Sequence, residues 1–188
     1  AKKMNLTDAK NVHAAFGRMN FPEKRMSTRK GNIVLLEEVI DEAITLARKV
    51  VEEKNPELSS EKKDEVAQMV GIGALKFAVL VQNRETNITF TCEKMLSLEG
   101  ETAPYVQYAY ARAKSILRKA DDVAEVNATE AHASKNSYEL HEKQEIDLAR
   151  LLVKFPLVIE QALEDFRPNY VARYMAVVAS YFNSFYGS

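Results

Sequence analysis

The chain has 188 residues, 46% of them hydrophobic, and a formal net charge of −1, which suits one large or two small domains and argues against a general nucleic-acid coat protein. It has no run of about 18 apolar residues that could span a membrane, and its first residues lack the apolar core of a signal peptide. A single cysteine excludes an internal disulfide and fits a reducing cytoplasm, where we expect the protein, and three scattered histidines do not suggest a metal site.

The first segment, residues 1–33, is predicted to be irregular with a short extended part. Phe16-Gly17-Arg18 and Phe21-Pro22 are typical of extended chain or turns. Residues 1–30 hold eight lysines and arginines against two acidic residues. The opening of the chain is therefore basic, although the whole chain is nearly neutral.

Two helices are predicted next. Apolar residues at helical spacing begin at Leu36, and this helix should end near residue 55, because Pro56 disfavours helix in the residue before it. Ser59 or Ser60 can cap a second helix that runs to about residue 80.

Gly71-Ile72-Gly73 lies inside the second predicted helix. A phosphate-binding glycine loop would need a third glycine and a preceding strand, so we interpret the pair as a site of close helix packing. Residues 87–91 alternate polar and apolar side chains and predict a short strand. Cys92 is interpreted as a small buried apolar residue, because no nearby histidine could activate it.

A third helix is predicted to begin at Pro104, a favoured place for proline. Tyr108, Arg112 and Lys119 fall roughly on one face of it, and residues 121–137 are polar and predict a loop. The apolar stripe of this helix is Val106, Ala109, Ala113, Ile116, Leu117 and Ala120.

The remaining chain predicts three further helices, at residues 140–155, 157–166 and 168–186, with a break at Pro156. There is no alternation of strands and helices and no internal repeat. The expected fold is therefore mainly α, a helical bundle with a short irregular or β segment near the N-terminus.

Residues 25–32, Arg-Met-Ser-Thr-Arg-Lys-Gly-Asn, form the most informative stretch. Three cations, two hydroxyls and a glycine stand in a short loop just before an amphipathic helix. Such a set can hold a polyphosphate, since preorganised cations and donors stabilise negative charge that builds up in a transition state. Gly31 allows a tight turn or close approach of the backbone to a ligand.

This octapeptide resembles the KMSKS loop of class I aminoacyl-tRNA synthetases, in the form K-M-S-x-R-x-G-N. Arg25 replaces the first lysine, which keeps the charge but not the geometry and leaves the role of that residue open. Thr28 replaces the second lysine, a departure that is frequent in arginyl-tRNA synthetases. The resemblance implies that the catalytic ATP-phosphate loop consists of Arg25, Met26, Ser27, Thr28, Arg29 and Lys30.

A second signature, residues 100–112 (Gly-Glu-Thr-Ala-Pro-Tyr-Val-Gln-Tyr-Ala-Tyr-Ala-Arg), resembles the start of the DALR anticodon-binding domain of arginyl-tRNA synthetases. The resemblance covers nearly the whole chain. It implies that residues 1–33 end a catalytic domain, that 34–99 form a helical stem-contact region, and that 100–188 form the anticodon-binding domain. We expect a fragment cut at both ends, with this last domain truncated at its C-terminus.

An anticodon-binding domain contacts phosphates with cations and splayed bases with aromatic rings. The tRNA-binding candidates implied by the resemblance are Tyr108, Arg112, Arg118, Lys119 and Tyr186. For the two tyrosines, core packing remains an alternative, and for the last two cations a solvated helix face does. Tyr105, Phe182 and Phe185 are interpreted as packing residues.

The implied function is ATP-dependent attachment of arginine to tRNA(Arg), with Mg²⁺ accompanying ATP and the protein acting as a monomer away from membranes. The HIGH motif and the nucleotide-binding fold are absent from these 188 residues, so the fragment should be inactive alone.

Three alternatives remain, of which a purely structural helical bundle leaves both motifs unexplained. The chain could be a stand-alone, non-catalytic tRNA-binding helical module that uses the basic loop for RNA. It could also belong to another class I synthetase, such as the cysteinyl or methionyl type, although residues 102–112 argue against that.

Overall fold

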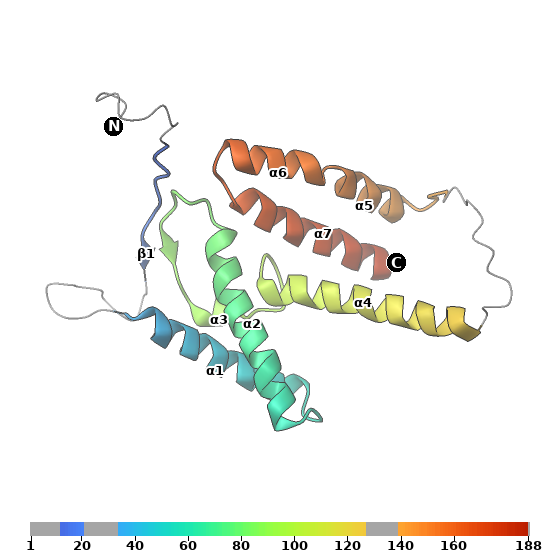
Figure 1. Cartoon of the computed structure of the whole chain (residues 1–188), viewed down its shortest axis with the longest axis horizontal. Coiled ribbons are helices and arrows are strands. Elements are labelled where there is room, and N and C mark those ends of the chain that lie inside the picture. Colours follow the sequence, from blue (N-terminus) through green and yellow to red (C-terminus); the bar gives the residue numbers. More distant parts are fainter. Residues whose placement is uncertain (1–11, 21–33, 127–138, 188) are drawn as a thin grey trace, which may run out of the picture.

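The computed structural model describes residues 12–20, 34–126 and 139–187. Figure 1 shows a mainly helical arrangement, which confirms the expected fold class. The elements are β1 (Met19–Asn20), α1 (Leu36–Lys54), α2 (Ser60–Leu80), β2 (Ile88–Thr89), α3 (Cys92–Met95), α4 (Ala103–Val126), α5 (Lys143–Val153), α6 (Phe155–Glu164) and α7 (Asn169–Gly187).

Helices α1 and α2 pack together through small side chains. Ala43 and Ala47 of α1 and Ala67 of α2 are fully buried, and the Ser59 hydroxyl caps α2 by accepting from the Lys62 amide. A Cβ added to Gly71 would lie 2.9 Å from the backbone of α1. The interpretation of this glycine as a close-packing residue is therefore confirmed.

Replacing Gly71 by alanine should destabilise the fold. The new methyl would meet backbone atoms of α1, which cannot rotate away, and overpacking of this kind costs about 1–3 kcal/mol. A gain of about 1 kcal/mol in helix propensity offsets part of that cost. Urea unfolding should show a lower midpoint for Gly71→Ala and no loss for the control Gly187→Ala, whose Cβ would enter open space. Equal midpoints would contradict the close approach.

Ionic contacts also join α1 to α2. Lys63 is only 6% exposed, and its Nζ donates to Glu52 Oε1 and to the Pro56 carbonyl, both at 2.7 Å. Arg48 bonds both Glu52 and Asp64. Hydrogen bonds from Lys63 and then Arg48 hold the pKa of the Glu52 carboxyl below its ordinary value. The contribution of this network is therefore present at neutral pH and is lost as pH falls through that lowered pKa.

The two short strands form a parallel pair in which Met19 faces Ile88 and Asn20 faces Thr89. The strand predicted at residues 87–91 is thus confirmed for Ile88 and Thr89 only. The pairing holds the described end of the basic N-terminal segment beside the turn that follows α2 (Figure 1).

In the second half of the chain, α7 packs against α4, α5 and α6. The helix predicted from residue 140 begins instead at Lys143, because Glu142 and Glu145 form a capping box there. The break between α5 and α6 is at Lys154, and Pro156 lies in the first turn of α6. Helix α4 continues to Val126, so the loop predicted from residue 121 was placed too early; no glycine or proline interrupts that stretch.

The burial predicted for three residues was wrong. Leu117, placed in the apolar stripe of α4, is 57% exposed, and Ala120 is also exposed. Figure 1 shows α4 extending past the end of α7, which leaves the later turns of α4 uncovered by that helix. Phe185, expected in the core, is 37% exposed in the last turn of α7. Phe182 is half-buried and stacks on the ring of Tyr186, with ring centres 6.3 Å apart.

Candidate nucleic-acid interface

An arginine lies between two tyrosine rings where α4 meets α7. The guanidinium carbon of Arg112 lies 4.6 Å from the ring centre of Tyr108 and 4.9 Å from that of Tyr186. Its Nη2 donates to the Tyr108 hydroxyl, and its Nη1 donates to Asn183 Oδ1 at 3.3 Å. Helical spacing explains the arrangement, since Tyr108 and Arg112 are four residues apart on α4, and Asn183 and Tyr186 are three apart on α7.

We call Tyr108, Arg112, Asn183 and Tyr186 the arginine–tyrosine cluster. The structure brings together three residues that the sequence named separately, and it adds Asn183, which had no predicted role. Tyr108 and Tyr186 are each 51% exposed, so they are not core residues. Contacts of this type contribute about 0.5–1 kcal/mol at exposed sites and preorganise the guanidinium.

The cluster has the chemistry of a nucleic-acid contact. Among the described residues, the hydrogen-bond partners of Arg112 are neutral oxygens, so its charge is not neutralised by an acidic side chain there. A guanidinium offers several donors to phosphate, and exposed tyrosine rings offer surfaces on which bases can stack. Lys114 and the exposed Tyr110 add a second, looser pair at 5.8 Å.

The other two predicted cations lie further along α4. Because an α-helix has 3.6 residues per turn, Tyr108, Arg112 and Lys119 fall within about 40° of one another around its axis. Arg118 lies to one side of the helix face that these three residues share. Both Arg118 and Lys119 are exposed, but no contact identifies a role for them, and their assignment stays a prediction.

The ATP-phosphate loop predicted at residues 25–30 lies outside the described residues, as does the side chain of Cys92. The nearest described positions are Asn20 at the end of β1 and Val34, two residues before α1. The loop assignment therefore stays a prediction.

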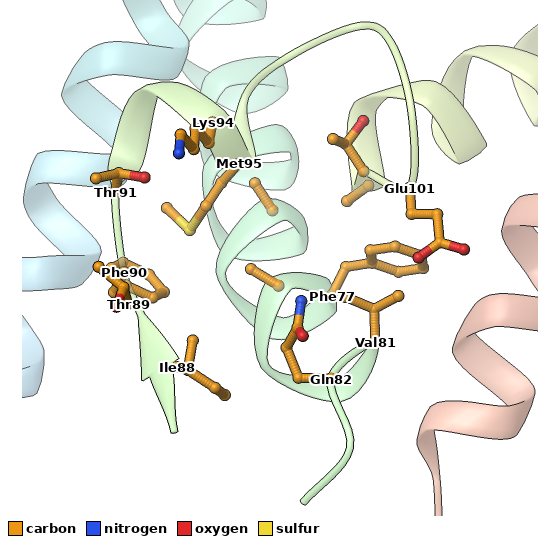
Figure 2. A pocket seen from close by; sticks show the side chains of 14 residues that line it. Phe77, Val81, Gln82, Ile88, Thr89, Phe90, Thr91, Lys94, Met95 and Glu101 are labelled. Carbon is orange, nitrogen blue, oxygen red and sulfur yellow. The ribbon is translucent and has the colours of Figure 1, made fainter. Parts of the chain in front are cut away.

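A small cavity of about 180 Å³ lies between α2, β2, α3 and the start of α4. Figure 2 shows Phe77, Val81 and Met95 among its apolar lining, with Lys94 and Glu101 also around it. Ligand pockets usually measure about 300–1,000 Å³, so this cavity is too small for a nucleotide.

Two larger hollows, of about 500 Å³ over α4, α5 and α7 and about 610 Å³ over α1, α2 and Met19, are almost wholly apolar. Such surfaces are unsuited to phosphate. In the part of the chain that is described, no group of three His, Cys, Asp or Glu side chains could hold a metal, and no helix is long and apolar enough to cross a membrane.

The sequence matches two protein-family models. Residues 1–92 match the family described as tRNA synthetases class I (R), catalytic domain. Residues 106–188 match the DALR anticodon-binding domain. The chain belongs to the arginyl-tRNA synthetase family. The arginine–tyrosine cluster lies within the range of the anticodon-binding model, whereas the exact domain boundaries predicted at 33/34 and 99/100 stay predictions.

Curated relatives agree with this arginyl-tRNA synthetase assignment. The arginine–tRNA ligase of Clostridium perfringens is 45% identical over 96% of this chain, which spans 31% of that protein. That of Streptococcus pneumoniae (strain CGSP14) is 43% identical over 93% of this chain, which spans 29% of it. The chain thus spans less than a third of the length of these relatives.

Solved structures show the same fold. The arginyl-tRNA synthetase of Thermus thermophilus superposes with a TM-score of 0.77 at 36% identity, covering 94% of this chain and 27% of that one. The arginyl-tRNA synthetase of Plasmodium falciparum gives 0.71 at 24% identity, covering 92% of this chain and 28% of that one.

Proposed function

We propose that this chain is the part of an arginine–tRNA ligase that supplies the ATP-phosphate loop and the tRNA-binding helices. The observation that carries the proposal is the arginine–tyrosine cluster on α4 and α7, which lies within the residues that match an anticodon-binding domain. The likeness to arginine–tRNA ligases over nearly the whole chain supports the amino-acid specificity.

In the proposed reaction, the arginine carboxylate attacks the α-phosphate of ATP and pyrophosphate leaves. Negative charge builds up on the phosphates during this step. Arg25, Arg29 and Lys30 supply positive charge there, and Ser27 and Thr28 supply hydroxyl donors. Each charge-assisted hydrogen bond that strengthens in the transition state contributes about 1.5–3 kcal/mol.

ATP is a substrate here, and Mg²⁺ accompanies its phosphates. Mg²⁺ keeps much of its shell as water and phosphate oxygens, so the proposal assigns it no ligand among the described residues. We place the reaction in the cytoplasm, with the ligase acting as a monomer.

The helices of the second half then bind tRNA(Arg). Arg112 contacts a phosphate from its position between the two rings, with Lys119 and Arg118 further along the same helix. Tyr108 and Tyr186 stack on splayed bases of the anticodon loop, each stack contributing about 1–3 kcal/mol. Phosphate contacts fix the position of the tRNA, while base contacts supply the specificity.

Pyrophosphate exchange into ATP tests the proposal. The full-length ligase that carries this segment should catalyse exchange with arginine and not with cysteine or methionine. The 188-residue chain alone should make no aminoacyl adenylate, because its sequence contains no HIGH motif and its described residues form no nucleotide-binding fold. Arginine-dependent exchange by the chain alone, or exchange with another amino acid by the full-length protein, would overturn the assignment.

A further inference from the structure

The turn between α2 and β2, residues 81–87, is held from two sides (Figure 1). On one side, the Gly17 amide donates to the Arg84 carbonyl at 2.6 Å, and the Arg18 amide donates to Asn87 Oδ1 at 2.8 Å. On the other side, Arg173 Nε of α7 donates to the Val81 carbonyl at 3.2 Å. The segment before β1 and the first turns of α7 therefore meet at this turn.

The side chain of Arg84 joins these two sides directly. Its Nη1 donates to the Ala15 carbonyl at 2.5 Å, and its Nε donates to the Phe166 carbonyl at 3.1 Å. Ala15 lies in the range of the catalytic-domain model and Phe166 in that of the anticodon-binding model. With its side chain 22% exposed, Arg84 is a largely covered bridge between the two matched parts.

The backbone at one acceptor of this bridge and close to the other is constrained. Phe166 has a positive φ of 55°, a conformation uncommon for a bulky residue, at the turn between α6 and α7. Gly17 lies so close to the turn that an added Cβ would be 2.2 Å from the Thr86 carbonyl oxygen. The bridge therefore joins two constrained stretches of backbone.

The two acceptors also connect to the proposed functional residues. Helix α7 begins three residues after Phe166 and ends with Asn183 and Tyr186 of the arginine–tyrosine cluster, about 25 Å away along the helix. In the other direction, β1 ends at Asn20, five residues before the basic octapeptide in sequence.

We infer that Arg84 is a positioning residue that couples the tRNA-binding helix α7 to the segment leading into β1, and so transmits tRNA binding to the catalytic part of the ligase. This inference rests on the proposed function. Arginine suits the role because its planar fork donates to two carbonyls in fixed directions, whereas a lysine presents one ammonium and cannot reproduce the fork.

Hydrogen exchange on the 188-residue chain tests the coupling. In the unmodified chain, tRNA(Arg) should slow exchange of the Gly17 and Arg18 amides as well as of α7. In Arg84→Ala and Arg84→Lys, protection of α7 should remain and the added protection at Gly17 and Arg18 should disappear. If only the charge of Arg84 mattered, lysine would restore the coupling. Added protection of the Gly17 and Arg18 amides in Arg84→Lys, equal to that in the unmodified chain, would therefore overturn the inference.

Kinetics of the full-length ligase give a second readout. Arg84→Ala should lower kcat for aminoacylation about tenfold or more while changing the Kd for tRNA(Arg) less than twofold. The matched control is Arg48→Ala, which removes a guanidinium whose two partners lie within α1 and α2, and it should keep kcat. An unchanged kcat in Arg84→Ala, or equal losses in both variants, would contradict the inference. If the unmodified protein neither binds nor charges tRNA(Arg), the proposed function itself fails.

Discussion

Replacing Arg112 by alanine should weaken binding of tRNA(Arg) to this chain by about 10–100-fold. The change removes one phosphate-binding charge and also the group that holds the rings of Tyr108 and Tyr186 in place. Losing a charge-assisted contact costs about 1.5–3 kcal/mol, and loosening a stacking platform adds to that. Fluorescence anisotropy with labelled tRNA(Arg) measures the effect directly.

Two further variants make this result specific. Arg112→Lys keeps the charge but not the flat group between the rings, so it should recover only part of the affinity. Arg150→Ala removes an exposed arginine of α5 that lies 3.8 Å from Asp147, and it should bind as the unmodified chain does. Because Arg112 is not a core residue and both tyrosines are half exposed, far-ultraviolet circular dichroism should be unchanged in all three. Affinity within twofold of the unmodified chain for Arg112→Ala would contradict the proposed interface.

Replacing Arg29 and Lys30 together by alanine should lower the rate of arginine-dependent pyrophosphate exchange in the full-length ligase about 10²–10³-fold for each transition-state donor lost. The two cations are proposed to stabilise charge that develops on the ATP phosphates. The loss should appear in kcat and equally in kcat/KM, with KM nearly unchanged, because removing an interaction made only in the transition state lowers both constants together.

The same double variant should leave tRNA affinity nearly intact, since the loop and the arginine–tyrosine cluster have separate roles. Lys2→Ala with Lys3→Ala is the matched control, because it removes two cations from the same basic segment outside the octapeptide. An equal loss of exchange in this control would show that general positive charge, not the loop, supports the reaction.

The helices could largely be predicted from the sequence. Apolar spacing and Pro56 located α1, and Ser59 marked the start of α2, because these signals act within a few residues. Some helix boundaries were predicted wrongly because local capping interactions set them. One example is the capping box that starts α5 at Lys143 rather than at residue 140. The exposure of Leu117 depends on where α7 ends. The spacing of apolar residues within α4 gives no information about that position.

The candidate site could be predicted only in part. Motif resemblance named Tyr108, Arg112 and Tyr186, but their meeting depends on packing between helices about 75 residues apart in sequence, which no local pattern encodes. Asn183 and the bridge made by Arg84 were missed for the same reason, since each role exists only through distant backbone or side-chain partners.

Binding of the 188-residue chain to tRNA(Arg) and to an unrelated tRNA, across a salt series, tests the central claim most directly. The account predicts tighter binding to tRNA(Arg), weakened when its anticodon loop is altered and retained in part as salt rises. Weak binding that is equal for both tRNAs and falls steeply with salt would indicate only a basic surface, and it would contradict the assignment of tRNA recognition to α4 and α7.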